Sequence, residues 1–427
     1  MDYKKEMLKS LQELVAIDSV KADPEEGAPF GKGARQALDY FLNLAKELGF
    51  ETTNVDGYAG NVDFKGKTDE LFGILAHLDV VPFGEGWTRN PLGELVGDTL
   101  YGRGTQDDKG PAIVILYALK ELKDRGFVPN KTIRLIVGCD EESGWADIAY
   151  YTKKYKMPSI GFSPDADFPI INREKGIVHF TFSGDFPNSN ISLEAGSRPN
   201  IVPNKAYLTL DGKHNFDGFE CTFNNDKTVV FAEGISAHGS LPQEGDNAAH
   251  KLLKLLKEID PSLSFYYDTF ASIDGSGLNI KMSDEVSGNL TSNLGVINIK
   301  DGKFNAVVDI RYPVTKDFEE IKERINKIID GKCVIADYYH QKPLYVPDNH
   351  PLIKNLLDAY EEVTGLKGYT VAIGGGTYSR ALPVAVGFGP IFLDEEATIH
   401  QKDERVKISN LNKLYDVYIK AIINCTK

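Results

Sequence analysis

The sequence predicts an α/β domain, built as a mixed sheet sandwiched by helices, with an α+β domain inserted into it. At 427 residues the chain is longer than one hydrophobic core usually supports, so two domains are expected. Strand-like apolar runs alternate with amphipathic helices up to residue 174, and helical patterns return after residue 344. Between these segments strand-like runs dominate. We therefore expect the α/β domain at residues 1–174 and 344–427, and the inserted domain at 175–343.

Hydrophobic spacing predicts the elements of the α/β domain in order. Apolar residues at helical spacing indicate a helix at the N-terminus and a second at 33–48, which Gly49 would end as a C-cap glycine. The run at 71–76 is almost wholly apolar, as in strands buried on both faces. The same reasoning gives strands near Asn61, at 132–139 and at 158–164, and helices at 111–122, 350–364 and 411–423.

The inserted domain has a different pattern. Only two clear helices occur in it, at 247–259 and 318–329, while most of its segments have the β-branched and aromatic content of strands. This composition indicates an α+β fold. The strands are expected at 176–183, 206–211, 228–234, 295–300 and 304–312.

The composition is that of an ordinary globular protein, with 42% hydrophobic and 26% charged residues, so no disordered region is expected. A formal net charge of −14 disfavours binding to nucleic acid or to an anionic membrane. The four cysteines form no CxxC pair, which argues against disulfides and zinc–thiolate sites. Charges interrupt the apolar spacing of the first helix, so we expect neither a signal peptide nor a membrane span, but a cytoplasmic protein with a small substrate.

Polar side chains follow three of the predicted buried strands. His77 and Asp79 follow the first, Glu141 and Glu142 the second, and Asp165 the third. Active sites of open α/β folds lie at such strand ends. Consecutive carboxylates repel one another, so a cation is expected beside them. Asp79 can accept one ring proton of His77 and leave the other nitrogen for a metal, although a structural, hydrogen-bonded His77 is the alternative.

Two further clusters lie outside the strand ends. Asp107 and Asp108 stand in a glycine-rich turn before a helix, where N-capping is the alternative to ligand binding. His400 follows another acidic run near the end of the chain. The GGGTYSR segment lacks the ending of a phosphate-binding loop, which disfavours nucleotide binding, but its amides can cradle a carboxylate.

These side chains favour a two-metal centre. Two histidines and three carboxylates suit a pair of divalent, zinc-like ions when one carboxylate bridges them and a water completes the site. Such a centre activates water for amide hydrolysis without a serine or cysteine nucleophile, and Glu141 is left over as the proton carrier. We expect two zinc ions per chain, with manganese or cobalt as alternatives. The predicted ligands are His77, Asp107, Glu142, Asp165 and His400.

Eight segments in order carry a family resemblance: HLDVVP, GRGTQDDKG, DEESG, SPDADFP, SAHGSLPQEGDNA, DIRYP, GGGTYSR and ATIHQKDE. Together they resemble the co-catalytic zinc metallopeptidase family of carboxypeptidase G, aminoacylase, succinyl-diaminopimelate desuccinylase and carnosinase. Within it they are most similar to the bacterial dipeptidase V branch. The resemblance covers residues 72–404 and implies an α/β catalytic domain with an inserted lid.

The resemblance implies a role for each predicted ligand. Asp107 would bridge the two ions. His77 and Asp165 would bind one ion, and Glu142 and His400 the other. A cis peptide bond is implied after Asp107.

Other positions match proton-transfer and substrate-binding residues of the family. Glu141 would be the general base that activates a metal-bridging water, and Asp79 would orient a ligand. His238 matches a lid histidine that contacts the reacting carbonyl, with an ordinary turn residue as the alternative. Arg311 would bind the substrate carboxylate, or else be a structural ion-pair partner. The other residues expected to bind this carboxylate are Asn200, Gly374, Gly375 and Gly376.

The expected function is metal-dependent hydrolysis of dipeptides with a free N-terminus. An N-acyl-amino-acid deacylase or desuccinylase of the same family is one alternative, because it shares the metal ligands. A non-catalytic metal-binding protein is an alternative from another class, although this chain keeps the base and every ligand. The inserted segment is too long for one small lid unit, and the resemblance implies that its extra part replaces a partner's lid, so a monomer is expected.

Overall fold

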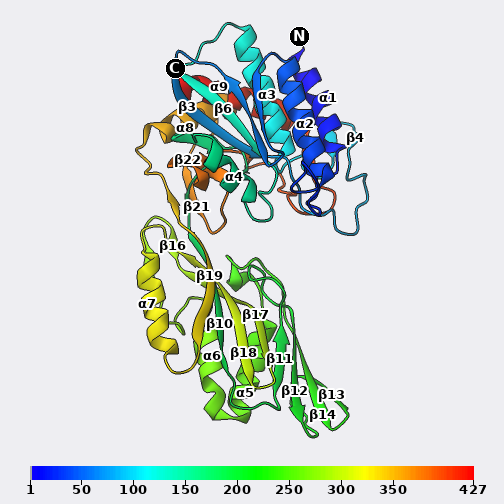
Figure 1. Ribbon diagram of the computed structural model, residues 1–427, viewed down its shortest axis with the longest axis vertical. Coiled ribbons are helices and arrows are strands. Elements are labelled where there is room, and N and C mark those ends of the chain that lie inside the picture. The colour runs from blue at the N-terminus through cyan, green and yellow to red at the C-terminus, as the bar shows by residue number, and fades with distance from the viewer. Residues whose placement is uncertain (1) are drawn as a thin grey trace. The chain divides into compact units, whose positions relative to one another are not determined.

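The computed structural model describes residues 2–427, which fall into two units (Figure 1). The first unit contains the chain up to Asn172, together with Val346–Val371 and Gly376–Lys427. The second contains Arg173–Tyr345 and also Ala372–Gly375, a short return of the chain that the sequence did not indicate.

The first unit is organised around a mixed sheet. Strands β6, β3, β7 and β22 are parallel to one another, while β1 and β2 extend the sheet at one side and β9 at the other in antiparallel pairing. The parallel strands therefore end at the same edge. In spatial order the strands are β1 (Glu51–Val55), β2 (Ala59–Phe64), β6 (Lys131–Gly138), β3 (Thr68–His77), β7 (Ile160–Ser163), β22 (Val384–Gly387) and β9 (Ile170–Glu174).

Both faces of this sheet are covered. Phe72 and Ile74 of β3 pack into the larger core, with α1, α2, α3, α8 and α9. Leu75 belongs to a second core with Ile148 of α4 and Tyr378 of η3. Burial on both faces explains why β3 reads as an unbroken apolar run. The elements that cover the sheet are α1 (Tyr3–Val15), α2 (Lys32–Glu47), α3 (Lys109–Asp124), α4 (Ala146–Lys154), α8 (Pro351–Thr364), α9 (Ile408–Thr426) and η3 (Tyr378–Ala381).

Two small sheets complete the first unit. Strand β5 (Thr99–Tyr101) pairs antiparallel with both β4 (Glu94–Val96) and β24 (Arg405–Lys407). Strand β8 (Ala166–Asp167) pairs parallel with β23 (Pro390–Ile391). The pairing of β5 with β24 joins segments about 300 residues apart, one on each side of the insertion.

The second unit is an antiparallel sheet with its own hydrophobic core, to which α5 (Ala248–Ile259), α6 (Ser264–Phe270) and α7 (Phe318–Ile329) contribute. On β10 the core side chains alternate with half-buried ones, as one-sided packing requires. In spatial order the strands are β13 (Glu220–Asn224), β14 (Lys227–Glu233), β12 (Lys205–Asp211), β11 (Ser192–Ala195), β17 (Thr291–Lys300), β18 (Lys303–Tyr312), β10 (Gly176–Asp185) and β19 (Val334–Gln341). Shorter elements are η1 (Pro242–Glu244), η2 (Pro261–Leu263), β15 (Ser283–Asp284) and β16 (Gly288–Asn289). Strands β20 (Leu344–Tyr345) and β21 (Thr370–Ile373) pair with β9 in the mixed sheet.

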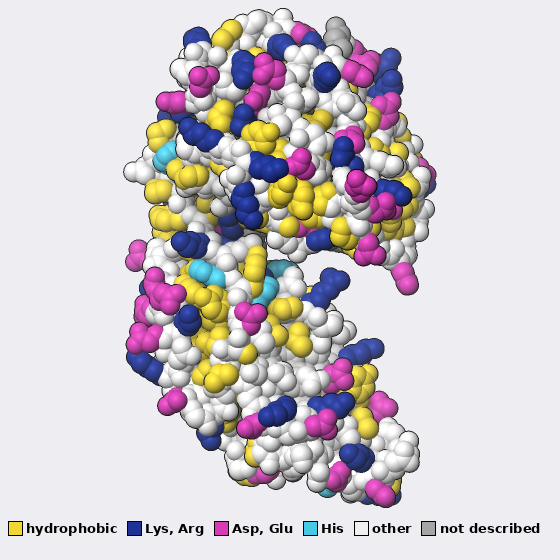
Figure 2. All heavy atoms as spheres, in the orientation of Figure 1, with side chains coloured by type: hydrophobic (Ala, Val, Ile, Leu, Met, Phe, Trp, Pro, Cys, Tyr) yellow, Lys and Arg dark blue, Asp and Glu magenta, His cyan; other side chains and the backbone are white. Residues whose placement is uncertain are grey.

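The predicted helices and strands occur in the predicted order. Helix α2 stops one residue before Leu48, and Gly49 follows with a φ of 86°, as a C-cap glycine does. The sequence did not predict the helices α4 and α6, several longer strands (β1, β9, β11, β13, β19 and β22) or the shortest strands. Acidic and basic side chains are interspersed on the face shown in Figure 2. Within residues 2–427, none of the helices combines the length and the apolar content that crossing a membrane requires.

Candidate metal centre

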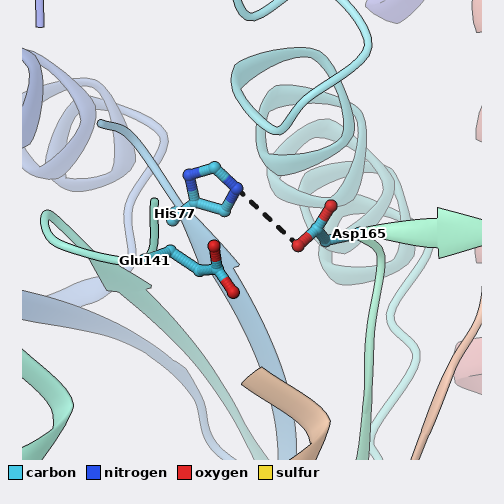
Figure 3. Close-up of side chains that lie close together, drawn as sticks. All are labelled: His77, Glu141 and Asp165. Atoms are coloured by element: carbon cyan, nitrogen blue, oxygen red, sulfur yellow. Dashed lines mark ion pairs between the residues drawn. The ribbon is translucent and has the colours of Figure 1, made fainter. Parts of the chain in front are cut away.

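Three parallel strands of the first unit deliver polar residues to one edge of the sheet. His77 is the last residue of β3, Glu141 and Glu142 follow β6, and Asp165 follows β7. The side chains of His77, Glu141 and Asp165 converge (Figure 3), and His77 Nε2 lies 3.8 Å from Asp165 Oδ2. The parallel pairing brings these residues together, because the carboxyl ends of the strands meet.

The Asp107 carboxylate lies between two histidines from distant parts of the chain. Its Oδ1 is 2.8 Å from His77 Nε2, and its Oδ2 is 3.0 Å from His400 Nε2. His400 Nε2 is also 3.0 Å from Glu142 Oε1. The structure therefore brings the five predicted ligands into one cluster, in which each Asp107 oxygen faces a different histidine.

The polar atoms of this cluster fit divalent metal ions. His77 Nε2 and Asp107 Oδ1 are buried and close together, yet neither makes a hydrogen bond. Because buried polar atoms nearly always have partners, atoms that converge without hydrogen-bond geometry have the arrangement expected of metal ligands. Imidazole nitrogens and carboxylate oxygens are also donors that zinc and similar ions accept.

A backbone carbonyl orients His77. Its Nδ1 lies 3.0 Å from the carbonyl oxygen of Asp79, which can only accept, so Nδ1 carries the proton and Nε2 presents its lone pair to the cluster. The Asp79 carboxylate, the predicted acceptor, is farther away at 3.5 Å. It accepts instead from the backbone amides of Glu141 at 3.2 Å and Glu142 at 3.1 Å. Asp79 thus holds the predicted ligand His77 through its carbonyl, and through its carboxylate it holds the segment that carries the candidate base Glu141.

Asp108 does not cap the helix that follows it. It occupies the N-cap position of α3, but its side chain makes no capping hydrogen bond. Its Oδ2 accepts from the backbone amide of His77 at 3.2 Å, which ties the turn to the end of β3. The N-capping alternative is therefore wrong for Asp108. The peptide bond between Asp107 and Asp108 is cis, as the family resemblance implied.

Buried charge alters proton binding throughout the cluster. Burial and the neighbouring Asp107 raise the pKa of Asp165 to about 8. Burial and Asp165 raise the pKa of Glu141 well above its ordinary value. Burial opposes protonation of His400, but its contacts with Asp107 and Glu142 prevail and raise its pKa to about 11. Nearby cations favour the ionised form of carboxylates that otherwise repel one another.

The predicted substrate-binding residues of the second unit gather near β18. Arg311 donates to Asp309 through Nε and Nη2, both at 2.8 Å, and to the Gly374 carbonyl through Nη1 at 2.7 Å. A Cβ on Gly374 would lie 2.7 Å from the Cβ of Ser240, whose hydroxyl is 2.6 Å from His238 Nδ1. The second unit therefore holds Arg311, Gly374 and His238 in one neighbourhood. The pair with Asp309 is the structural role kept as the alternative for Arg311, so substrate binding by Arg311 stays a prediction.

Asn200 lies in the same neighbourhood. Its carbonyl accepts from the Gly239 amide at 2.7 Å. Asn293, directly opposite Asp309 across β17 and β18, donates to the carbonyls on either side of Asn200 at 2.9 and 3.1 Å. We did not predict Asp309 or Asn293 from the sequence. A signal existed for Asp309, because residues two apart on a strand point to the same face and Asp309 precedes Arg311 by two.

The glycine run is divided between the two units. Gly375 belongs to the second unit and Gly376 to the first. A Cβ on Gly376 would lie 2.7 Å from Arg380 Nε, so the side chain of Arg380 packs directly against the backbone there. A carboxylate-binding role for either glycine stays a prediction.

Divalent ions are expected to stabilise the protein against heat. A ligand that binds only the folded state adds about 2.7 kcal/mol at 100 times its Kd, so chelated protein should unfold at a higher temperature once zinc, manganese or cobalt is added. The double variant His77→Ala/His400→Ala should lose this shift. His214→Ala is the control, because His214 Nε2 contacts the Asp211 carbonyl in the other unit. Scanning calorimetry would contradict the centre if no metal shifted the wild-type transition.

Comparison with known proteins identifies the family. Residues 73–424 match the family described as Peptidase family M20/M25/M40. The putative dipeptidase YtjP of Bacillus subtilis is 35% identical in an alignment that covers 99% of this chain and 98% of the relative.

Solved structures share the fold. The M20 family metallo-carboxypeptidase Sso-CP2 from Sulfolobus solfataricus has a TM-score of 0.62 and 17% identity, with 99% of each chain covered. Aminoacylhistidine dipeptidase from Vibrio alginolyticus has a TM-score of 0.61 and 14% identity, covering 98% of this chain and 96% of that one. The predicted α/β catalytic domain with an inserted α+β lid domain and the predicted family resemblance are both confirmed. The chain therefore belongs to peptidase family M20/M25/M40 and is a metallopeptidase.

Proposed function

We propose that the protein is a metal-dependent dipeptidase that hydrolyses dipeptides with a free N-terminus. The observation that carries this proposal is the Asp107 carboxylate, whose two oxygens face His77 and His400 separately, with Glu142 beside His400. This arrangement suits a bridging ligand between two ions. The description of YtjP as a putative dipeptidase supports the substrate class.

The ligands are proposed to hold two divalent ions, zinc before manganese or cobalt. Asp107 would bridge them, His77 and Asp165 would complete one site, and Glu142 and His400 the other. When bound, such ions polarise a carbonyl and lower the pKa of a water molecule.

Glu141 is proposed to move the proton. It stands beside His77 and Asp165, and its backbone amide is held by Asp79. It would accept a proton from the attacking water as the water oxygen bonds to the scissile carbon. It would then give that proton to the amine nitrogen when the carbon–nitrogen bond breaks.

His238 is proposed to donate a hydrogen bond to the oxygen of the reacting carbonyl. The Ser240 amide donates to His238 Nδ1 at 3.2 Å, so Nδ1 is an acceptor and the ring proton of the neutral imidazole belongs on Nε2. In that tautomer the Nε2–H group can donate to the carbonyl oxygen, on which negative charge develops during the reaction. The lid unit would present His238 to the reacting carbonyl.

Arg311, Asn200 and the glycine run are proposed to bind the substrate carboxylate. Acidic groups near the ions would bind the free ammonium at the other end. A site that binds both ends of the substrate would accept peptides of only one length, that of a dipeptide. We also propose that the protein is cytoplasmic and acts as a monomer.

Replacing the proposed base should separate metal binding from turnover. Glu141→Gln is expected to keep both ions and to lower kcat by about 10² to 10⁴, the usual contribution of general acid–base catalysis. Metal content and steady-state kinetics are the measurements. Glu362→Gln is a matched control, since Glu362 pairs with Lys420 on the helical surface. Normal turnover by Glu141→Gln would show that another group carries the proton.

Acetylating the substrate amine should remove most of the activity. A dipeptide and its N-acetyl derivative would be compared at equal concentration, with kcat/KM as the measurement. The expected loss follows from the missing ammonium at a site closed at both ends. Equal rates for the two substrates would favour the N-acyl-amino-acid deacylase or desuccinylase instead. Metal binding without hydrolysis of either would favour the non-catalytic alternative.

Mixing two inactive variants tests the proposed monomer. His238→Ala and Glu141→Gln would be combined, and activity would be compared with that of each variant alone. In a dimer whose lid histidine reaches the neighbouring site, a mixed dimer recovers one intact site. A monomer recovers none, so no gain is expected. Sedimentation of the mixture provides the mass independently, and recovered activity would refute the monomer.

A further inference from the structure

Two loops of the first unit each carry one predicted metal ligand: Asp107 lies on one loop and His400 on the other. The Asp107 loop (residues 102–107) follows β5, and the His400 loop (residues 396–404) precedes β24. The two loops leave a common base, because β5 and β24 pair antiparallel. Each loop also sends one buried side chain into the other.

Glu404 reaches from the His400 loop into the Asp107 loop. Its side chain is fully buried, and its Oε1 accepts from the backbone amides of Gly104 at 3.0 Å, Gln106 at 3.0 Å and Asp107 at 3.3 Å. Its Oε2 accepts from Arg103 Nη1 at 2.7 Å. One carboxylate thus fixes the backbone up to and including the proposed bridging ligand.

Gln106 reaches in the opposite direction. It is 2% exposed, and its Oε1 accepts from the Thr398 amide at 2.8 Å and from Thr398 Oγ1 at 2.9 Å. Its Nε2 donates to the Glu396 carbonyl at 3.1 Å. These bonds hold the segment just before His400.

The two loop ligands need such support more than the strand-end ligands do. His77 is part of β3 and is buried, so the sheet itself fixes its position. The side chain of His400 is 50% exposed, and its backbone has a φ of 61°, in the left-handed region that non-glycine residues rarely adopt. For the two loops, the hydrogen bonds of Gln106 and Glu404 do what strand pairing does for His77.

We propose that Gln106 and Glu404 are positioning residues, which lock the Asp107 loop to the His400 loop and so set the spacing of the two ligands around one divalent ion. The proposal deepens the proposed two-metal function and rests on it. The side-chain hydrogen bonds of Gln106 end on the segment just before His400, to which Thr398 belongs. Their loss therefore affects the ion held by Glu142 and His400 more than the ion held by His77 and Asp165.

Metal titration of Gln106→Leu tests the proposal. Metal-free proteins would be titrated with zinc in a calorimeter, and bound zinc would be measured after dialysis. Wild-type protein is expected to bind two ions. Gln106→Leu is expected to keep one ion at wild-type affinity and to bind the other about 10- to 100-fold more weakly, the usual effect of removing a residue that supports a metal ligand. Adding Gln106→Leu to His400→Ala should then cause little further loss.

Asn61→Leu is the matched control. Asn61 is a buried amide of the same unit, but it donates to Asp63 at 3.2 Å and accepts from Tyr151 at 3.1 Å instead of joining the two loops. It should lower thermal stability while binding both ions normally. Equal weakening of both ions by Gln106→Leu, unchanged binding of both, or the same selective loss in Asn61→Leu would each overturn the proposal.

Thr398 provides a second pair of variants should Gln106→Leu fail to fold. Thr398→Val removes the hydroxyl that donates to Gln106, whereas Thr398→Ser keeps it. Selective weakening by Val with recovery by Ser supports the proposal, and identical zinc binding by the two variants overturns it. If wild-type protein binds fewer than two ions, the proposed two-metal centre itself fails. Two ions bound at wild-type affinity by every Gln106 and Thr398 variant would overturn the positioning role alone.

Discussion

Repulsion between clustered buried and half-buried carboxylates is the constraint around which the first unit is arranged. Asp107, Asp165, Glu141 and Glu142 converge at one edge of the sheet, and burial and mutual repulsion raise the pKa values of the last three. Two carboxylates 4 Å apart at an effective dielectric constant of 20 repel by about 4 kcal/mol. Loops free to relax would separate these charges. The structure keeps them together because each acid stands on a strand end or on a loop that buried polar contacts hold.

The end of β6 shows how closely the backbone is held. Two buried carboxylates accept hydrogen bonds from four consecutive backbone amides. Asp147 accepts from the amides of residues 139 and 140 at 2.6 and 2.9 Å. Asp79 accepts from the amides of residues 141 and 142 at 3.2 and 3.1 Å. The Tyr378 hydroxyl donates to the same Asp147 oxygen. The glycine-rich segment therefore serves both units, since Gly374 and Gly375 belong to the second unit while Tyr378 supports the acidic edge of the first.

The features predicted from the sequence are those whose burial leaves a local pattern. Strand β3 is apolar because both of its faces are covered, and its abrupt polar end indicated His77. Strand β19 was missed because most of its residues are exposed, so it lacks an apolar alternation. Gln106 and Glu404 were missed for another reason: their partners lie about 300 residues away, and neither residue type nor spacing signals such a contact. The sequence thus indicated the charged groups of the site but not the contacts that hold them.

Arg311 in the second unit is likewise a charged group whose supporting contacts were not predicted from the sequence. A guanidinium has five N–H donors, and three of its bonds here go to Asp309 and to the Gly374 carbonyl. Asp309 neutralises the charge of Arg311, so attraction for an anionic substrate would come from directed N–H groups and not from net charge. The bond to Gly374 also means that moving Arg311 moves the glycine backbone. Structural pairing and substrate binding are therefore compatible roles for Arg311, because the ion pair that fixes the guanidinium plane also aims its remaining donors.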